Sequence, residues 1–249
     1  MGTIPDIPAV LLVGGMGTRL RSVLPSRPKP LASIGNRSFL NLLVRQLRYQ
    51  GIRRLVMCTG YLADQIEGEF GDGKALDVEI EYSKESRPLG TAGAVKLAEG
   101  HIRDASEFLV MNGDSFVDID FRQLIRFHRT HGGLASMAVL KVKNTSRYGT
   151  VQVNDTGRVI EFSEKTGNGR PGLVSAGVYV FNQSIFGYVP DGPASLEKDV
   201  FPRLLDRGIY ALEHDGMFID IGTPEDYARA QELCDRLYEA ARYHDTGSS

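Results

Sequence analysis

The chain has 249 residues, of which 42% are hydrophobic and 24% charged, and a formal net charge of −2 at pH 7. This balance is typical of a globular protein with a large core, and it argues against broad binding to nucleic acids or anionic membranes. Two cysteines are too few for a disulfide framework, and no apolar run approaches the ~20 residues of a membrane span. Because the N-terminal stretch also lacks the pattern of a signal peptide, we expect a cytoplasmic protein with no membrane partner.

Strand-like and helix-like stretches alternate through the first half of the chain. Apolar runs predict strands at residues 9–13, 54–59, 78–83 and 108–112. Helical spacing of apolar residues predicts helices at residues 39–50, 62–70, 90–99 and 121–131. This alternation indicates an α/β fold with a mainly parallel central sheet, in which ligands bind at the carboxyl ends of the strands.

The second half changes character. Short strands separated by turns are predicted at residues 135–141, 149–153, 159–164 and 174–181, which indicates a mixed extension of the sheet. A helix is predicted at 196–207, followed by strands at 209–212 and 218–220. The last helix is predicted to begin with Thr223 as N-cap and Pro224 at its first position.

A glycine-rich loop follows the first predicted strand, with the sequence GGMGTR at residues 14–19. Glycines let the backbone turn and bring its N–H groups close to a ligand, and such amides before a helix start bind anions, usually phosphate. Arg19 and Lys29 would add positive charge. The loop fits neither the Walker pattern nor the dinucleotide fingerprint, and an ordinary strand-to-helix turn remains an alternative.

Two carboxylates, Asp114 and Asp220, each end an apolar strand-like run. Mg²⁺ is held by one or two carboxylates together with phosphate oxygens and water, so this pair is a candidate metal site. A turn or helix-capping role is the alternative for each. Asp118 and Asp120 form a D-x-D pattern that does not directly follow a predicted strand, and they fit a solvated edge or a helix N-cap better than a metal site.

Glu164 and Lys165 end another predicted strand, where the lysine could pair with a sugar phosphate and the glutamate with sugar hydroxyls. An exposed salt bridge is the alternative for this pair. The five histidines lack metal-ligand spacing, and no Ser-His-Asp or Cys-His arrangement is evident. The sequence therefore predicts no nucleophilic side chain.

Seven segments taken together resemble the sugar-1-phosphate nucleotidyltransferases, also called nucleotide-sugar pyrophosphorylases. They are GGMGTRL (14–20) with PKP (28–30), PLGTAG (88–93), NGD (112–114), YGTV (148–151), EK (164–165), AGVY (176–179) and IDIGT (219–223). The resemblance covers nearly the whole chain. It implies a Rossmann-like, three-layer fold and the transfer of a nucleotidyl group from an NTP to a sugar 1-phosphate, with Mg²⁺ and release of pyrophosphate.

The resemblance also implies a role for individual residues. Arg19 would hold the leaving pyrophosphate and Lys29 would neutralise charge growing at the α-phosphorus, as the catalytic residues. The nucleotide would be bound by Leu12, Gly14, Gly15, Gly17, Thr18, Gly90, Thr91 and Gly113. The metal would be bound by Asp114 and Asp220. The sugar would contact Gly149, Glu164 and Gly177, and its phosphate Lys165.

The same resemblance implies one nucleotidyltransferase domain over residues 1–249. Its nucleotide-binding half would cover about 8–132, its sugar-binding half about 133–222, and a C-terminal helix about 223–243. Since the family is usually multimeric, a homo-oligomer is one expectation.

The choice of substrates is a finer prediction. The first loop and the PLGTAGA turn look most like the D-glycero-α-D-manno-heptose 1-phosphate guanylyltransferases, which predicts GTP and that heptose phosphate, for bacterial surface polysaccharide. Mannose-1-phosphate guanylyltransferases share the Gly-Thr-Ala turn. Thymidylyltransferases usually carry glutamine where this chain has Gly93, and a uridylyltransferase remains open. A non-catalytic nucleotide sensor and a glycosyltransferase are the alternatives from other classes.

Overall fold

A computed structural model describes residues 7–15, 17–20, 23–164 and 169–243. The chain forms two compact units that are interleaved in the sequence. The first unit comprises Met1–Pro88, Met111–Asp120 and Met217–Ser249, and the second comprises Leu89–Val110 and Phe121–Gly216. The predicted halves, in contrast, follow one another along the chain.

Three parallel strands form the sheet of the first unit. They are β1 (Ala9–Leu12), β4 (Arg54–Thr59) and β5 (Glu79–Lys84), paired in that order. All apolar residues of β4, and all of β1 except Leu12, are buried, which explains their continuous apolar sequences. The end of β6 (Glu107–Asn112) belongs to this unit as well. The predicted parallel sheet is confirmed.

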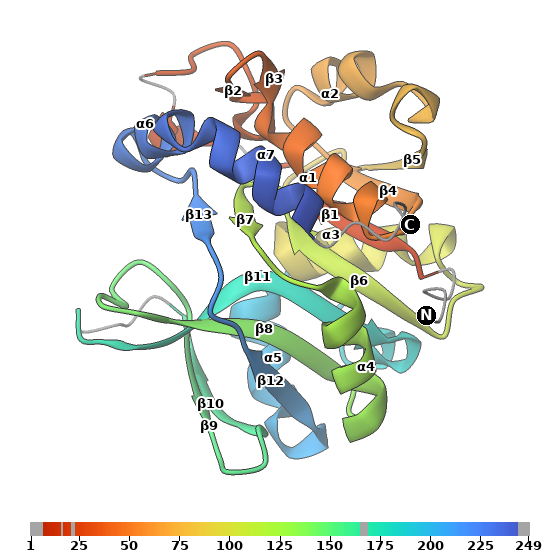
Figure 1. Cartoon of the computed structure of the whole chain (residues 1–249). Helices are drawn as coiled ribbons and strands as arrows, with labels where there is room; N and C mark the ends of the chain where they lie inside the picture. Colours follow the sequence, from red (N-terminus) through yellow and green to blue (C-terminus); the bar gives the residue numbers. More distant parts are fainter. Residues whose placement is uncertain (1–6, 16, 21–22, 165–168, 244–249) are drawn as a thin grey trace, which may run out of the picture. The chain divides into compact units, whose positions relative to one another are not determined.

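Helices α1 (Phe39–Tyr49) and α7 (Cys234–Tyr243) lie side by side although they come from opposite ends of the chain (Figure 1). The side chain of Ser38 caps α1 by accepting a hydrogen bond from the Asn41 amide. The predicted last helix is in fact two, because α6 (Pro224–Glu232) ends before α7 begins. The side chain of Thr223 caps α6, as the sequence predicts.

A small antiparallel sheet in the first unit joins β7 (Ser115–Val117) to β13 (Phe218–Asp220), and both strands are labelled in Figure 1. Its register places Asp220 opposite Ser115. Strand β7 was not predicted, since it has only three residues and follows β6 after a two-residue turn. This pairing brings the two candidate metal ligands together.

The other elements of the first unit are short. They are the 3-10 helices η1 (Thr18–Leu20), η2 (Lys29–Leu31) and η3 (Lys74–Leu76), strands β2 (Ser33–Ile34) and β3 (Arg37–Ser38), and helix α2 (Ala63–Phe70).

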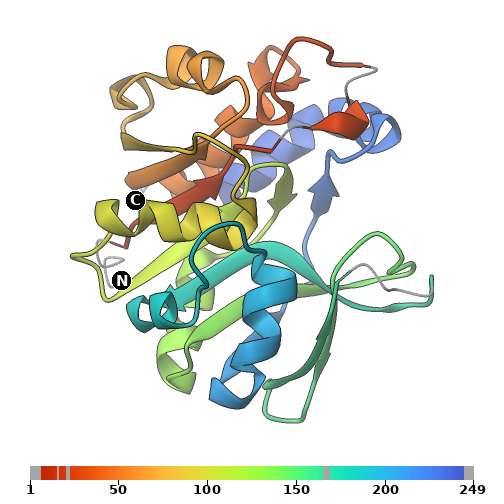
Figure 2. The ribbon, with the colours of Figure 1, turned by 180° about the vertical axis from the view of Figure 1, so that it is seen from behind.

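The second unit holds a mixed sheet, as predicted. Its strands are most of β6 with β8 (Ala135–Val142), β9 (Thr150–Val153), β10 (Val159–Ser163), β11 (Gly172–Asn182) and β12 (Ile209–Glu213). Strand β11 pairs antiparallel with β8 and β9, and β8 pairs parallel with β12. Strands β9 and β10 form the antiparallel hairpin drawn in green in Figure 2.

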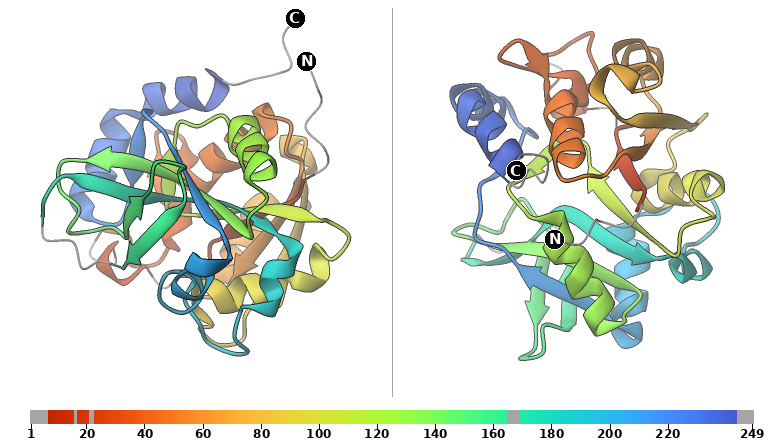
Figure 3. Two further views of the ribbon diagram at one scale, coloured as in Figure 1. Left: turned by 90° about the horizontal axis from the view of Figure 1, so that it is seen from below. Right: turned by 45° about the vertical axis from the view of Figure 1, so that its right-hand side comes forward.

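The α-helices of the second unit are α3 (Gly90–Leu97), α4 (Phe121–His131) and α5 (Phe201–Leu204). Helix α4 packs on β8 and β12 (Figure 3). The continuous helix predicted at 196–207 is wrong, because the segment changes from a π-helix (Leu196–Val200) to α5 and then to a 3-10 turn. Pro202, which has no N–H to donate, lies at this change. Within the described part of the chain, no helix is long and apolar enough to span a membrane.

Candidate active site

The loop after β1 lies against two other segments of the first unit. The Val13 amide donates to the Cys58 carbonyl oxygen at 3.1 Å, which continues the β1–β4 pairing into the loop. Gly17 has a φ of +56°, and a Cβ there would lie 3.0 Å from the Cβ of Lys29. Gly17 therefore meets both conditions that favour glycine, a left-handed backbone and a close neighbour.

Gly14 and Gly113 permit close approaches of backbone to backbone. A Cβ at Gly14 would lie 3.2 Å from the Gly60 nitrogen, and a Cβ at Gly113 would lie 2.8 Å from the Leu12 carbonyl oxygen. That carbonyl accepts a hydrogen bond from the Gly113 amide at 3.0 Å. The carboxyl ends of β1 and β6 thus meet as the parallel-sheet prediction requires.

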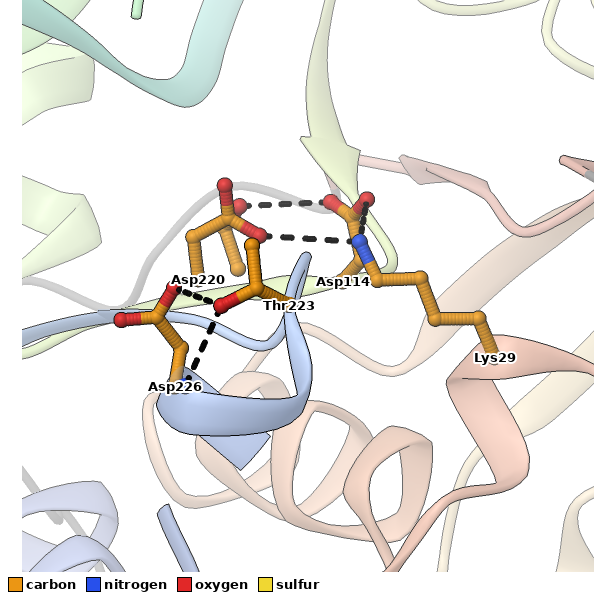
Figure 4. A network of polar contacts seen from close by, with 6 residues as sticks. Lys29, Asp114, Asp220, Thr223 and Asp226 are labelled. Carbon is orange, nitrogen blue, oxygen red and sulfur yellow. Dashed lines mark hydrogen bonds and ion pairs between the residues drawn. The ribbon is translucent and has the colours of Figure 1, made fainter. Parts of the chain in front are cut away.

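Lys29 is held between the two predicted metal ligands (Figure 4). Its Nζ donates to Asp114 Oδ2 at 2.6 Å and lies 3.6 Å from Asp220 Oδ1. The Lys29 side chain is 10% exposed, against 38% for Asp114 and 21% for Asp220. Three segments that are distant in sequence therefore converge on one ammonium group.

The electrostatics of this cluster favour a charged Asp114. Removal from water raises the pKa of its carboxyl, but the Lys29 charge together with the hydrogen bonds from Lys29, Ser115 and the backbone lowers it by more. Ser115 also donates a hydrogen bond to Asp114, at 3.2 Å. The net result is a pKa below the usual value for aspartate, so Asp114 is ionised at neutral pH.

Asp220 is positioned by the turn that follows β13. A Cβ at Gly222 would lie 2.9 Å from Asp220 Oδ1, so this carboxylate occupies space that only a glycine leaves open. The Ile221 amide donates to the Asp114 carbonyl oxygen at 3.0 Å and ties the two aspartate segments together.

A pocket of about 180 Å³ lies beside this cluster within the first unit. Its lining residues are Leu12, Val13, Gly15, Gly17, Arg19, Leu20, Lys29, Pro30, Asp114 and Gly222. The predicted phosphate loop, both predicted catalytic residues and one predicted metal ligand thus share one pocket. Arg19 contributes an exposed side chain, from η1.

The carboxylates beside this pocket suit a Mg²⁺ ion whose remaining ligands come from a substrate and water. In the described part of the chain, no group of three or more His, Cys, Asp or Glu side chains could hold a metal ion alone. Asp114 and Asp220 nevertheless face a common cation, the Lys29 ammonium. Mg²⁺ is commonly held by one or two carboxylates, with phosphate oxygens and water as further ligands, so the residues present fit that ion.

The predicted nucleotide-binding turn at Gly90 and Thr91 has a structural role within the second unit. The Thr91 hydroxyl donates to Glu197 at 2.8 Å and accepts from the Leu196 amide at 2.8 Å. Gly90 has a φ of +71°, and a Cβ there would lie 2.5 Å from the Ala194 carbonyl oxygen. These contacts fasten the segment before α5 to the start of α3.

Two of the four predicted sugar-site residues, Gly149 and Glu164, lie against each other in the second unit. The Gly149 carbonyl accepts a hydrogen bond from the Ser175 amide at 2.9 Å, and a Cβ at Gly149 would lie 3.1 Å from Glu164 Oε2. Gly177, with a φ of +73°, lies where the pairing of β11 with β8 shifts register. The fourth residue, Lys165, lies outside the described residues.

Glu85 is a candidate that the sequence analysis missed. It directly follows β5, and a Cβ at Gly60 or Gly14 would lie 2.5 Å or 3.2 Å from its Oε1. The Glu85 carboxylate therefore lies against the first loop. The signal that identified Asp114, an acidic residue at the carboxyl end of a predicted parallel strand, applies equally to Glu85.

The prediction that the D-x-D pattern of Asp118 and Asp120 does not directly follow a strand was wrong. Strand β7 ends at Val117, so Asp118 does follow a strand directly. The segment is tied down by its backbone, since the Asp118 amide donates to Met217 and the buried Gln50 side chain donates to the Ile119 carbonyl. It forms a structural link beside the aspartate cluster.

Comparison with known proteins decides the family. Residues 8–236 match the nucleotidyl transferase family. The chain belongs to this family. The resemblance deduced from the sequence is confirmed at that level.

Curated relatives in this family are similar to the chain over most of the chain's length. It is 38% identical over 222 residues to the mannose-1-phosphate guanylyltransferase catalytic subunit beta of Drosophila melanogaster, covering 88% of this chain and 60% of that protein. It is 37% identical to the mannose-1-phosphate guanylyltransferase of Mycobacterium tuberculosis, covering 90% of this chain and 63% of that protein. The chain thus spans about three fifths of these curated relatives.

Solved structures give a closer match in length. The crystal structure of HddC from Yersinia pseudotuberculosis complexed with GMP-PN is 32% identical, with a TM-score of 0.81, and covers 91% of this chain and 98% of HddC. A Bacillus anthracis structure at 22% identity has a TM-score of 0.83, covers 97% of this chain and 98% of its own, and supports the fold alone.

Proposed function

We propose that this chain transfers a guanylyl group from GTP to a sugar 1-phosphate and releases pyrophosphate. The observation that carries the proposal is the Lys29 ammonium, which Asp114 and Asp220 hold beside the pocket that the glycine loop lines. Family membership supports the reaction class. The guanylyltransferase names of the relatives and the GMP-PN complex of HddC support the nucleotide.

For this reaction the protein needs mainly to supply positive charge and to align the two phosphate-bearing substrates. A sugar phosphate is already an anionic nucleophile, so no general base is needed, and the obstacle is bringing two polyanions into line. Backbone amides of Gly14–Gly17 and the Arg19 side chain would bind the β- and γ-phosphates that leave together. Lys29 would offset the charge growing at the α-phosphorus. Bound Mg²⁺, on Asp114 and Asp220, would add further positive charge to the phosphate oxygens.

Glu85 supports guanine as the base. Guanine presents two adjacent N–H donors at N1 and N2, and a carboxylate can accept both, whereas adenine, uracil and thymine offer no such pair. The Glu85 carboxylate lies against Gly14 and Gly60, at the end of β5. We assign it to base selection.

Replacement of Glu85 by glutamine tests this assignment. A bidentate hydrogen-bonded pair contributes ~1–3 kcal/mol of base discrimination, so kcat/KM for GTP should fall by that amount relative to the other NTPs. Glu79→Gln, on the exposed side of the same strand, is the matched control and should change nothing. An unaltered preference for GTP in Glu85→Gln would remove Glu85 from the base site.

For the sugar, we propose D-glycero-α-D-manno-heptose 1-phosphate, with mannose 1-phosphate supported equally well. The first rests on the loop sequences, and the second on the names of the curated relatives. Contacts to the sugar would come from Gly149, Glu164 and Gly177, and contacts to its phosphate from Lys165. A GDP-heptose product would serve bacterial surface polysaccharides, such as capsule or lipopolysaccharide.

Two broader features stay proposals. A cytoplasmic location is supported by the low cysteine count. Self-association is supported only by the usual behaviour of the family.

Pyrophosphate release measures the reaction directly. The four NTPs are each combined with heptose, mannose, glucose and N-acetylhexosamine 1-phosphates, and the expected result is release with GTP and either heptose or mannose 1-phosphate. Release with a different pair would contradict the substrate choice and keep the reaction class. No release from any pair, with nucleotide binding intact, would favour a nucleotide sensor.

A further inference from the structure

The Lys29 side chain has two partners that a metal ion would also require. Its Nζ is 2.6 Å from Asp114 Oδ2 and 3.6 Å from Asp220 Oδ1, and its side chain is only 10% exposed. Asp220 ends β13, and Asp114 directly precedes its partner strand β7, so without a cation these two carboxylates would repel each other. The ammonium therefore acts as the counterion of this pair.

A divalent cation and the ammonium cannot both occupy this position. Mg²⁺ binds oxygen ligands at 2.0–2.1 Å, and an ammonium donating to the same carboxylate oxygen would lie close beside it. Two like charges at such a separation repel strongly even at the effective dielectric of a protein surface. A metal ion held by both carboxylates at this position would therefore compete with the Lys29 ammonium and drive it away.

The backbone of Lys29 limits where its ammonium can go. Pro28 and Pro30 flank it, Pro30 and Leu31 are buried in η2, and its Cβ lies against Gly17. Only the flexible four-carbon stem can move. Since Lys29 lines the same pocket as Gly15, Gly17 and Arg19, a displaced ammonium remains among the residues assigned to the phosphates.

We propose that Lys29 is the resident counterion of the Asp114–Asp220 pair, and that metal binding releases its ammonium into the phosphate pocket. The inference rests on the proposed function. It makes metal binding and the movement of Lys29 toward the phosphates a single event. Metal loading would then deliver two positive charges to the nucleotide, the ion and the lysine. It would also keep Lys29 from the phosphates until the metal is in place.

Metal affinity without nucleotide tests the first half of this proposal. Mn²⁺ is titrated into wild type, Lys29→Met and Lys29→Arg, and free Mn²⁺ is followed by electron paramagnetic resonance. Removing the competing charge should tighten Mn²⁺ binding by about tenfold or more in Lys29→Met, while Lys29→Arg stays near wild type. Adding Asp220→Asn to Lys29→Met should abolish the gain. Equal or weaker binding by Lys29→Met, or no Mn²⁺ binding by it, would overturn the proposal.

The reactivity of Lys29 tests the second half in the wild-type protein and does not depend on how well a variant folds. Acetylation by an N-hydroxysuccinimide ester is followed residue by residue by mass spectrometry, with and without Mn²⁺. Lys29 should react severalfold faster with Mn²⁺, whereas Lys141, whose side chain is 75% exposed, should be unaffected. An unchanged or slower rate at Lys29 would overturn the proposal. Neither experiment uses GTP or a sugar phosphate, so pyrophosphate release can fail or succeed independently.

Discussion

Alanine at position 113 would place a methyl group where the first unit has no space for one. Its Cβ would lie 2.5 Å from Val13 Cγ1 and 2.8 Å from the Leu12 carbonyl oxygen. The Val13 side chain could rotate, but the carbonyl belongs to β1 in the buried sheet and cannot. The ends of β1 and β6 would have to separate, and Asp114, the next residue, would move with β6.

The expected cost is that of overpacking a dense interior, ~1–3 kcal/mol of unfolding free energy. Gly100→Ala is the matched control, since among the described residues no atom beyond its chain neighbours and its own helical backbone lies within 4 Å of its would-be Cβ. Reducing the entropy of the unfolded chain should make the control neutral or more stable by up to ~1 kcal/mol.

Urea unfolding measures both variants. The midpoint should fall in Gly113→Ala at an unchanged m-value, which indicates a loss of stability without a change in the unfolded state. Pyrophosphate release should also fall more than the loss of folded protein explains, because Asp114 moves. Wild-type stability in Gly113→Ala, or an equal loss in Gly100→Ala, would refute the steric reasoning.

Two further predictions concern charge. Lys29→Ala or Arg19→Ala should each lower kcat/KM by at least ~2–4 kcal/mol in transition-state terms, the range for losing one preorganised donor, and near-normal turnover in either would contradict the assignment. Burial lowers the pKa of His128, whose Nδ1 lies 3.0 Å from Ser136 Oγ. Because the unfolded state then binds the proton more readily, the stability present above pH ~6.5 is lost as the pH falls below it. Urea midpoints at pH 7.5 and 5.5 should therefore differ more for wild type than for His128→Gln, and equal differences would rule out this role.

Long periodic or apolar segments were predictable from the sequence, and short or context-dependent ones were not. The predicted bounds of β4 and α4 agree with the structure, because each has a clear apolar pattern between turn residues. Strand β7 was missed because three residues carry no period, and its pairing partner, β13, comes about a hundred residues later. The helix predicted at 196–207 is not continuous, because Pro202 has no N–H to donate within an unbroken α-helix.

For the site, the sequence could predict which residues end strands but not what their side chains contact. The rule that ligands gather at the carboxyl ends of parallel strands brought Asp114 and the first loop together correctly. The same sequence reasoning could not show that Thr91 contacts Glu197, a partner 106 positions away. Side-chain partners of that kind depend on the fold and carry no local signal.

The glycines of the site carry more information than their flexibility alone suggests. Most of them mark a point where the glycine backbone lies too close to another residue of the site for a side chain to fit. These pairs are Gly14 with Glu85, Gly17 with Lys29, Gly113 with Leu12, Gly149 with Glu164 and Gly222 with Asp220. Gly15 is the contrast, since no atom of the described residues lies within 4 Å of its would-be Cβ, and it lines the pocket. Alanine at the paired positions should therefore disturb the protein's own contacts, whereas alanine at Gly15 would project into space that a ligand can use. Substitution at Gly15 is thus expected to weaken nucleotide binding with little loss of stability, which separates the role of the loop in binding from its role in folding.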